Sequence, residues 1–248
     1  MTFRSSIVIT AYNEATAIVR PLESLIAAVT IPSEIIVVVD SDDDTTIPFV
    51  DDIANRCIAN SPHSLRIEVN SFGRGPSKAI RFGFFVAKCP VVVVTMADGC
   101  DDPYQIDELI RLVERGVVIA AASRYSRGGQ QIGAPRIKGI LSRVAGMSLK
   151  LFANVGTWDA TNSFKAYSKE FVERVNVESD KGFEVGIELV SKARRLKLPV
   201  AEVPTVWLER TTGTSNFKII EWLPRYLKWY LFAFGVGSFN NQDDSRNV

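Results

Sequence analysis

The chain has 248 residues, 46% of them hydrophobic, which is enough for one sizeable α/β domain. Its formal net charge of +1 gives no overall field that would argue for nucleic acid as a partner. Cys57, Cys89 and Cys100 are an odd number without C-x-x-C spacing, which argues against a disulfide framework or a zinc site and for a reducing compartment. His63 is the only histidine, so histidine triads and multi-histidine metal sites are all but excluded.

Strands alternate with helices through the first half of the chain, which predicts a mostly parallel sheet covered by helices on both faces. The expected strands are, in chain order, Ser6–Thr10, Glu34–Val39, Leu65–Val69, Val91–Thr95, Val117–Ala122 and Val200–Val206. The expected helices are Ala15–Val29, Ile47–Asn60, Pro76–Lys88, Pro103–Arg115, Ile137–Phe152 and Phe183–Leu196. An aromatic and basic segment, 219–234, follows them. No internal repeat is evident.

Polar residues follow the first two predicted strands. Tyr12 and Glu14 come just past the first strand, where a ring could stack on a nucleobase and a carboxylate could bond to its edge. Asn13 and Glu14 could instead simply begin a helix. Asp40 ends the second strand and is placed to accept hydrogen bonds from a base or ribose, although the acidic segment 40–44 could also be a solvated turn. Together these tips suggest a nucleotide pocket that lacks the G-x-G-x-x-G and Walker patterns.

The third and fourth strands lead into two further candidate segments. Gly73–Lys78 combines glycines, two cations and a helix start, which suits a phosphate cradle or an ordinary glycine turn. The valine-rich strand at 91–95 is followed by Asp98, with Asp101 and Asp102 close behind. Ligands of open α/β sheets bind beyond the carboxyl ends of the strands, and a carboxylate there can hold a hard cation that in turn holds phosphate oxygens.

Three later loops carry similar chemistry: 123–129, 159–165 and 210–218. The last combines two cations, hydroxyl groups and a glycine, a composition that suits a loop closing over a diphosphate. Each of the three could be a plain surface loop. Their occurrence in this order is what favours an enzyme that acts on an activated, phosphate-bearing substrate.

The order of these motifs resembles family-2 glycosyltransferases of the GT-A fold, and within them the dolichol-phosphate mannosyltransferase and polyprenyl-phosphate glycosyltransferase group. The resemblance runs from about residue 6 to about residue 232. The matching segments are Thr10–Glu14 (P-A-Y-N-E in the group), 38–43 (V-D-D-G-S), 74–83 (G-x-x-x-A-x-R-x-G), 96–103 (D-A-D-L-x-x-D-P), Ser123–Tyr125 (S-R-Y), Asp159–Tyr167 (D-x-T-S-G-F-R-A-Y), Lys181–Glu188 (G-F-E-x-x-x-E) and 210–215 (R-x-x-G-x-S-K).

The resemblance implies a GT-A, Rossmann-like domain over residues 1–218, followed by a C-terminal amphipathic helix and tail over 219–248. It implies inverting transfer of a sugar from a nucleotide diphosphate sugar to a polyprenyl phosphate, with Mg²⁺ or Mn²⁺ as cofactor. The implied catalytic residues are Asp98, Asp159 and Arg210, with Asp98 as the metal ligand. The implied nucleotide-binding residues are Ala11, Tyr12, Glu14, Asp40, Asp42 and Lys78. The implied phosphate- or acceptor-binding residues are Arg124, Arg136, Arg210 and Lys218.

The chain departs from the group's pattern at four positions: Thr10 replaces a proline, Met96 an acid, Cys100 a glutamine and Asn216 a lysine. Thioether and neutral thiol are poor ligands for a hard cation, so Asp98 would be the main protein ligand, with Asp101 as a second candidate. Metal affinity should then be weak without the phosphates of the donor.

Two alternatives remain open at this stage: transfer to a sugar or other hydroxyl acceptor, and a non-catalytic domain of the same fold that binds a nucleotide or a partner. A hydroxyl acceptor would need Asp159 as a base, whereas a phosphate acceptor is already anionic. The aromatic and basic tail suits a helix at a membrane interface or one packed on the domain or on a second copy of the chain. No apolar stretch reaches the ~20 residues that span a bilayer. We therefore expect a cytoplasmic protein, peripheral on the inner face of a membrane.

Overall fold

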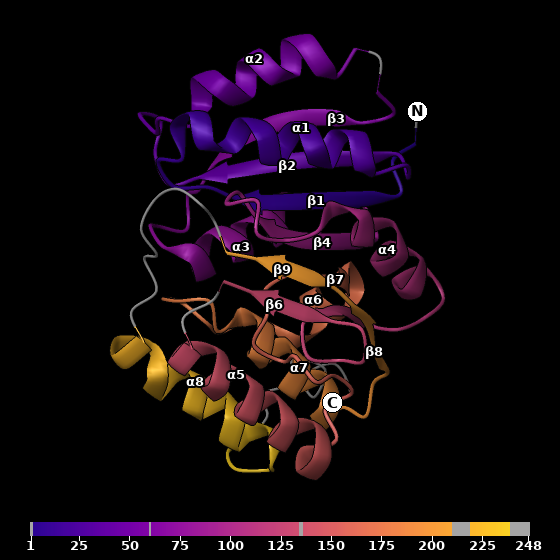
Figure 1. The fold of residues 1–248 in the computed structure, drawn as a ribbon, viewed down its shortest axis with the longest axis vertical. Coiled ribbons are helices and arrows are strands. Elements are labelled where there is room, and N and C mark those ends of the chain that lie inside the picture. The colour runs from indigo at the N-terminus through magenta and orange to yellow at the C-terminus, as the bar shows by residue number, and fades with distance from the viewer. Residues whose placement is uncertain (1, 60, 134–135, 210–218, 239–248) are drawn as a thin grey trace, which may run out of the picture.

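The computed structural model describes residues 2–59, 61–133, 136–209 and 219–238, with side chains omitted at 136–138 and 219–221. A seven-stranded sheet crosses the molecule in the order β3-β2-β1-β4-β7-β5-β8, and a two-stranded sheet pairs β6 with β9 (Figure 1). The strands are β1 (Ser5–Thr10), β2 (Ser33–Val39), β3 (Ser64–Val69), β4 (Val91–Met96), β5 (Ile119–Ser123), β6 (Gln130–Ile132), β7 (Lys165–Ser168), β8 (Val200–Pro204) and β9 (Val206–Leu208).

The pairing is parallel throughout except at β7, which runs antiparallel to both of its neighbours, β4 and β5. The α-helices are α1 (Val19–Ala28), α2 (Ile47–Cys57), α3 (Pro76–Val86), α4 (Ile106–Glu114), α5 (Arg136–Ser148), α6 (Lys169–Val175), α7 (Val185–Arg195) and α8 (Ile219–Ala233). Shorter turns are η1 (Ala15–Ile18), η2 (Pro103–Gln105) and η3 (Leu149–Ala153). The mostly parallel α/β architecture predicted from the sequence is therefore confirmed.

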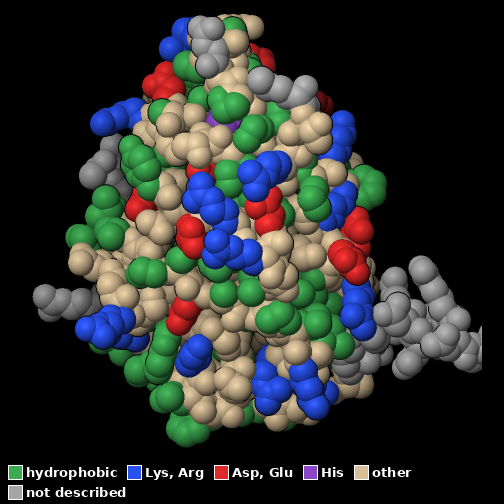
Figure 2. Space-filling model, turned by 90° about the vertical axis from the view of Figure 1, so that its right-hand side faces the viewer, with side chains coloured by type: hydrophobic (Ala, Val, Ile, Leu, Met, Phe, Trp, Pro, Cys, Tyr) green, Lys and Arg blue, Asp and Glu red, His purple; other side chains and the backbone are tan. Residues whose placement is uncertain are grey.

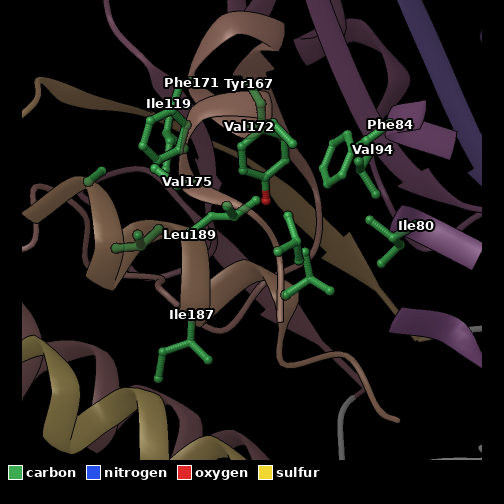
Figure 3. Close-up of a cluster of buried hydrophobic side chains, with 14 of the residues drawn as sticks. Ile80, Phe84, Val94, Ile119, Tyr167, Phe171, Val172, Val175, Ile187 and Leu189 are labelled. Atoms are coloured by element: carbon green, nitrogen blue, oxygen red, sulfur yellow. The ribbon is translucent and has the colours of Figure 1, made fainter. Parts of the chain in front are cut away.

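Alternating side chains of the sheet build two separate cores. Ile7 and Ile9 of β1 point into the core beneath α1, α2 and α4, whereas Val8 points into the core beneath α3, α6 and α7. Because both faces are covered, β1, β2 and β4 are buried along nearly their whole length and read as continuous apolar runs. In the second core the fully buried Tyr167 meets Phe84 edge to face, with ring centres 5.4 Å apart (Figure 3).

The aromatic tail helix, α8, packs on α7. Trp229 and Phe232 are buried there, and Lys192 and Arg195 of α7 stand over the two rings at 5.0 and 4.7 Å from their centres. These two rings are therefore core residues and not side chains at a membrane surface. The opposite face of α8, with Leu223, Leu227 and Leu231, is exposed. No helix in the described ranges is long and apolar enough to cross a membrane.

Three differences from the sequence prediction matter for the site. The expected helix Ala15–Val29 begins as the η1 turn and becomes α-helical only at Val19. The expected strand Val200–Val206 ends at Pro204, and the chain then enters β9 of the small sheet. The short strands β6, β7 and β9 were not predicted as separate elements, and the helix expected after 159–165 was predicted without bounds.

Candidate functional site

A cavity of about 800 Å³ lies beyond the carboxyl ends of β1, β2 and β4. Tyr12 follows β1, Asp40 follows β2 and Asp98 follows β4, and all three line this one cavity. Parallel strands direct their carboxyl ends to the same edge of the sheet, which is why segments so far apart in sequence converge there. The nucleoside and diphosphate ends of the expected site thus share one space.

The loop after β1 is held by the loop after β2. The carboxylate of Asp44, which is buried, accepts hydrogen bonds from the backbone N–H of Asn13 at 3.0 Å and of Thr46 at 2.8 Å. The hydroxyl of Thr46 accepts a further bond from the N–H of Glu14 at 3.1 Å. This support leaves the ring of Tyr12 53% exposed at the cavity, which is the position a stacking ring needs.

Asp40 joins the cavity to the start of α3. Its Oδ2 accepts a hydrogen bond from the N–H of Gly75 at 3.0 Å, and its Oδ1 accepts one from Asn70 Nδ2 at 3.1 Å. Gly75 precedes Pro76, the first residue of the helix, and has φ of 118°, a conformation that glycine adopts without strain. The helix N-terminus therefore faces the cavity in a fixed orientation.

The acids after β4 divide into one at the cavity and one that supports it. Asp98 Oδ1 accepts the N–H of Cys100 at 3.0 Å, and the structure describes no other hydrogen bond to this carboxylate. Asp101 accepts the hydroxyl of Thr95 at 2.8 Å, and burial together with nearby Asp98 raises the pKa of Asp101 to about 7. Met96 accepts a hydrogen bond through its sulfur from Thr10 at 3.2 Å.

The donor set at this end is oxygen from Asp98, with Asp101 beside it, rather than sulfur from Met96 or Cys100. Within the described residues no three acidic, histidine or cysteine side chains are grouped to hold a metal. One carboxylate oxygen together with the oxygens of a bound diphosphate fits Mg²⁺ or Mn²⁺, which prefer such ligands and keep several of their own waters. The described side chains do not fit a tight metal site made by protein groups alone.

A buried ion pair joins Asp159 to Arg124, which lines the cavity. Asp159 has no exposed surface and accepts three hydrogen bonds from Arg124: from the backbone N–H at 3.0 Å, from Nε at 2.7 Å and from Nη2 at 2.8 Å. Burial alone would raise the pKa of Asp159, but the guanidinium outweighs it and the pKa lies below its usual value. Arg124 lines the cavity and Asp159 does not, so the carboxylate orients the cation.

The far end of the cavity is apolar and aromatic. It is lined by Leu141 and Ala145 of α5, by Trp222, Leu223 and Tyr226 of α8, and by Phe183 and Trp207. Trp222 and Phe183 meet edge to face, with ring centres 5.6 Å apart. This end has the character of a site for an apolar group attached to the reacting phosphate.

The structure brings together six of the predicted residues: Ala11, Tyr12, Glu14, Asp40, Asp98 and Arg124 all line the cavity. Asp42, Lys78 and Asp159 do not line it. Arg210 and Lys218 lie outside the described residues, as does the side chain of Arg136.

Sequence reasoning missed two groups at the site. Asp44, one of several acids in a row, gave no signal that it alone would be buried beneath the first loop. Trp207 of β9 and Gln131 of β6 reach the cavity through the small sheet, which no periodicity announced. The apolar run of α5 was the signal that could have placed Leu141 and Ala145 at a binding surface.

This combination of fold and site is that of α/β domains that bind a nucleotide beyond the carboxyl ends of their strands. The chain belongs to glycosyl transferase family 2, whose sequence model matches residues 6–175.

Three curated relatives are similar in sequence. The chain is 27% identical to the dolichol-phosphate mannosyltransferase of Saccharomyces cerevisiae over 96% of this chain and 91% of that protein. It is 31% identical to the polyprenol monophosphomannose synthase of Mycolicibacterium smegmatis over 53% of this chain. It is 29% identical to the dolichol-phosphate mannosyltransferase of Pyrococcus furiosus over 90% of this chain. The matched regions span 54% of the mycobacterial protein and 64% of the archaeal one.

The fold is similar to crystal structures of glucosyl-3-phosphoglycerate synthase from Mycobacterium tuberculosis. The complex of that enzyme with Mn²⁺, UDP and phosphoglyceric acid has a TM-score of 0.64 at 18% identity, covering 95% of this chain and 80% of the other. Its complex with Mg²⁺ and UDP gives 0.61 at 17% identity, with 95% and 81% covered. The GT-A architecture expected from the sequence is thereby confirmed.

Proposed function

We propose that the chain transfers a sugar, with inversion at the anomeric carbon, from a nucleotide diphosphate sugar to a polyprenyl phosphate. The observation that carries the proposal is one cavity in which Tyr12, Asp40 and Asp98 meet an apolar wall formed by α5 and α8. The names of the sequence relatives, which specify polyprenol or dolichol phosphate and mannose, support the same chemistry.

The donor is held by groups at the strand ends. Tyr12 offers an exposed ring to the base, and Asp40 stands beside it to receive the ribose. Bound Mg²⁺ or Mn²⁺ would neutralise charge on the departing diphosphate, and Asp98 is the residue that would hold it. Arg124, already oriented by Asp159, supplies a fixed positive charge at the same place.

The buried ion pair favours a phosphate acceptor over a hydroxyl acceptor. A hydroxyl group must lose a proton during transfer, and its base needs access to the acceptor. Asp159 has no exposed surface, a lowered pKa and three hydrogen bonds to Arg124, so it is poorly suited to take that proton. A phosphate monoester is already anionic and needs a cation such as Arg124 rather than a base.

An apolar surface at the mouth of the cavity suits an acceptor that arrives from a membrane. Helices α5 and α8 lie side by side, joined by a hydrogen bond of 2.9 Å between Tyr230 and Ser148 (Figure 1). Exposed leucine, isoleucine and valine side chains cover both helices: Ile140, Leu141, Val144, Leu223 and Leu227. We include in the proposal a peripheral position on the inner face of a membrane, with residues 1–218 as the transferase domain and 219–248 as a helix and tail that complete the acceptor end.

Release of nucleoside diphosphate tests the proposal. Purified protein is given UDP- and GDP-sugars with Mn²⁺, Mg²⁺ or EDTA, and with a polyprenyl phosphate, phosphoglycerate or a sugar hydroxyl as acceptor. We expect metal-dependent release that requires the polyprenyl phosphate and is lost in Asp98→Asn. Asp42→Asn is the matched control, because Asp42 is exposed and lies outside the cavity. Release with a hydroxyl acceptor alone would overturn the acceptor assignment, and donor binding without any turnover would indicate a non-catalytic domain.

A further inference from the structure

A second cavity, of about 360 Å³, lies between the end of α7 and the segment after η3. It is lined by Asn154, Val155, Gly156, Arg194, Lys197, Leu198 and Val200. None of these residues lines the cavity at the strand ends. Asn154 and Lys197 have φ of 54° and 56°, so both walls turn sharply at this point. The second cavity is therefore a separate feature, built from two tight turns.

Three cations surround this second cavity without acidic partners. Arg194 and Lys197 line it, and Lys150 reaches its edge by donating to the carbonyl oxygen of Gly156 at 2.9 Å. Arg194 Nε donates to the carbonyl oxygen of Ala153. The three cations form no salt bridge to a described carboxylate, whereas Arg4, Arg56, Lys169 and Lys228 elsewhere on the described surface do. The site holds positive charge that the protein itself does not neutralise.

Cations near a helix C-terminus are favourable in their own right, because they complement the helix dipole. That effect applies to Arg194 in the last turn of α7 and to Lys150 in the last turn of η3, but neither helix dipole requires that the two ends bring their cations to one cavity. The carbonyl oxygens nearest these two side chains are already bonded. Their remaining N–H groups are thus available to an external anion.

Two exposed apolar side chains follow Lys150 in the sequence. Leu151 is 62% exposed and Phe152 is 78% exposed, and they stand just before Asn154 at the cavity. Single exposed apolar side chains are common on protein surfaces, but here two adjacent ones directly follow the cation Lys150, a composition suited to a membrane interface. At the lower end of the molecule, where α5 and α7 lie, Lys and Arg side chains gather next to hydrophobic ones (Figure 2).

We infer that the second cavity binds the phosphate of an anionic phospholipid headgroup, while Leu151 and Phe152 enter the acyl region beside it. The charge of Lys150, Arg194 and Lys197 complements such a surface, and the adjacent apolar pair matches its interior. A free phosphate would satisfy the cations but leave the apolar pair uncovered. The inference rests on the membrane position included in the proposed function, and adds to it a lipid that is bound and not consumed.

Vesicle sedimentation of the full chain tests the inference without donor or acceptor. Vesicles contain phosphatidylcholine alone, or phosphatidylcholine with one third phosphatidylglycerol. We expect binding to the anionic vesicles that weakens with added salt. Lys197→Asp and Phe152→Ser should each reduce that binding by about tenfold, from the attraction of a basic side chain to an anionic surface and the burial of an aromatic ring. Aspartate suits the conformation at 197, since it tolerates positive φ better than most residues.

Matched substitutions on another face control for general effects of charge and hydrophobicity. Lys88 is exposed, and Phe85 is 70% exposed on α3. Lys88→Asp and Phe85→Ser should leave binding within about twofold of the unaltered protein, because only charge close to the membrane contributes. Equal losses in both pairs would overturn the site, as would unchanged binding of Lys197→Asp.

Calorimetry with inorganic phosphate and glycerol 3-phosphate separates the sources of the anion. Tight binding of either compound that is lost in Lys197→Asp, without vesicle binding, would mean a soluble ligand and would overturn the inference. Nucleoside diphosphate release with a short-chain, water-soluble prenyl phosphate keeps the two proposals apart. That release should be the same in Lys197→Asp as in the unaltered protein, and its absence from both would defeat the proposed function while leaving the vesicle result standing.

Discussion

Replacing Asp159 with asparagine tests the assignment of the buried ion pair. The substitution preserves the shape of the side chain but removes the charge that faces Arg124, whose side chain is 10% exposed. Arg124 then keeps a buried positive charge without a counter-ion. With its oxygen at the Oδ2 position the amide still accepts two of the three hydrogen bonds, whereas its nitrogen opposes the Nη2 donor.

The expected loss in the free energy of unfolding follows from the burial of the Arg124–Asp159 pair. Removing one partner of a buried salt bridge costs about 3–5 kcal/mol. For a domain of this size each kcal/mol lowers the Tm by about 2–4 °C, which gives a drop of about 6–20 °C. Lys165 limits the loss: burial lowers the pKa of this fully buried amine to about 7, and Asp159 is the charge that most opposes the change. Without that carboxylate, Lys165 can release its proton, so we expect the lower end of the range.

Urea denaturation of Asp159→Asn, Arg124→Gln and the double variant measures the free energy of unfolding of each. We expect the double variant to lose less of this free energy than the two single variants lose together, by at least about 1 kcal/mol. In Asp159→Asn, turnover with polyprenyl phosphate should fall because KM for the acceptor rises. The pH profile of kcat should keep the same shape as in the unaltered protein, including any decline at acidic pH. A stability loss under about 1 kcal/mol, or loss of a limb in that profile, would refute the positioning role and restore Asp159 as a base.

Three further outcomes follow from the structure. Met96→Asp should raise Mn²⁺ affinity in the presence of a nucleoside diphosphate by at least about tenfold, because a carboxylate is a ligand that hard cations prefer to a thioether; unchanged affinity by calorimetry would remove position 96 from the metal site. Burial lowers the pKa of His63, whose Nε2 and Nδ1 bond to Val29 and Ser33, so the unfolded chain takes up a proton more readily. The free energy of unfolding should therefore fall as the pH drops below about 6.5, and this loss should shrink in His63→Gln; parallel pH profiles in urea denaturation would contradict it. Gly83→Ala places a β-carbon 2.2 Å from Cγ1 of Val8 and should destabilise the fold by about 1–3 kcal/mol; an unchanged urea midpoint would show that α3 can shift away from β1.

The sequence carried enough information to predict the central sheet and the meeting of its strand tips. The valines of β4 are buried on both faces, so periodicity and burial agree there. Since the carboxyl ends of parallel strands meet at one edge, the order of the strands along the chain was sufficient to bring Tyr12, Asp40 and Asp98 together. Chemistry and topology point to the same place in this half of the chain.

The antiparallel strand β7 could not be predicted in the same way. It has four residues and includes Lys165, which has the character of a loop residue when read locally. Its position between β4 and β5 depends on pairing with distant segments. Lys165 is tolerated there because Ala160 and Asn162 offer carbonyl oxygens to its amine. The burial of Asp159 depends on the same arrangement and was equally beyond a local reading of the sequence.

The structure also joins two departures from the family pattern that seemed unrelated in the sequence. Thr10 stands where the group has proline, and Met96 stands where it has an acid. The two residues are direct neighbours in the register of β1 and β4, and the Thr10 hydroxyl donates to the Met96 sulfur at 3.2 Å. A proline at 10 has no such donor, whereas an aspartate at 96 could accept the hydroxyl with one oxygen and offer the other to the metal. We therefore interpret the pair as one exchange, in which a closed contact in the cavity wall stands where the family resemblance implies a metal ligand. In the proposed function the cation would be held by Asp98 and the phosphates of the donor, so metal and donor should bind this protein together rather than one after the other.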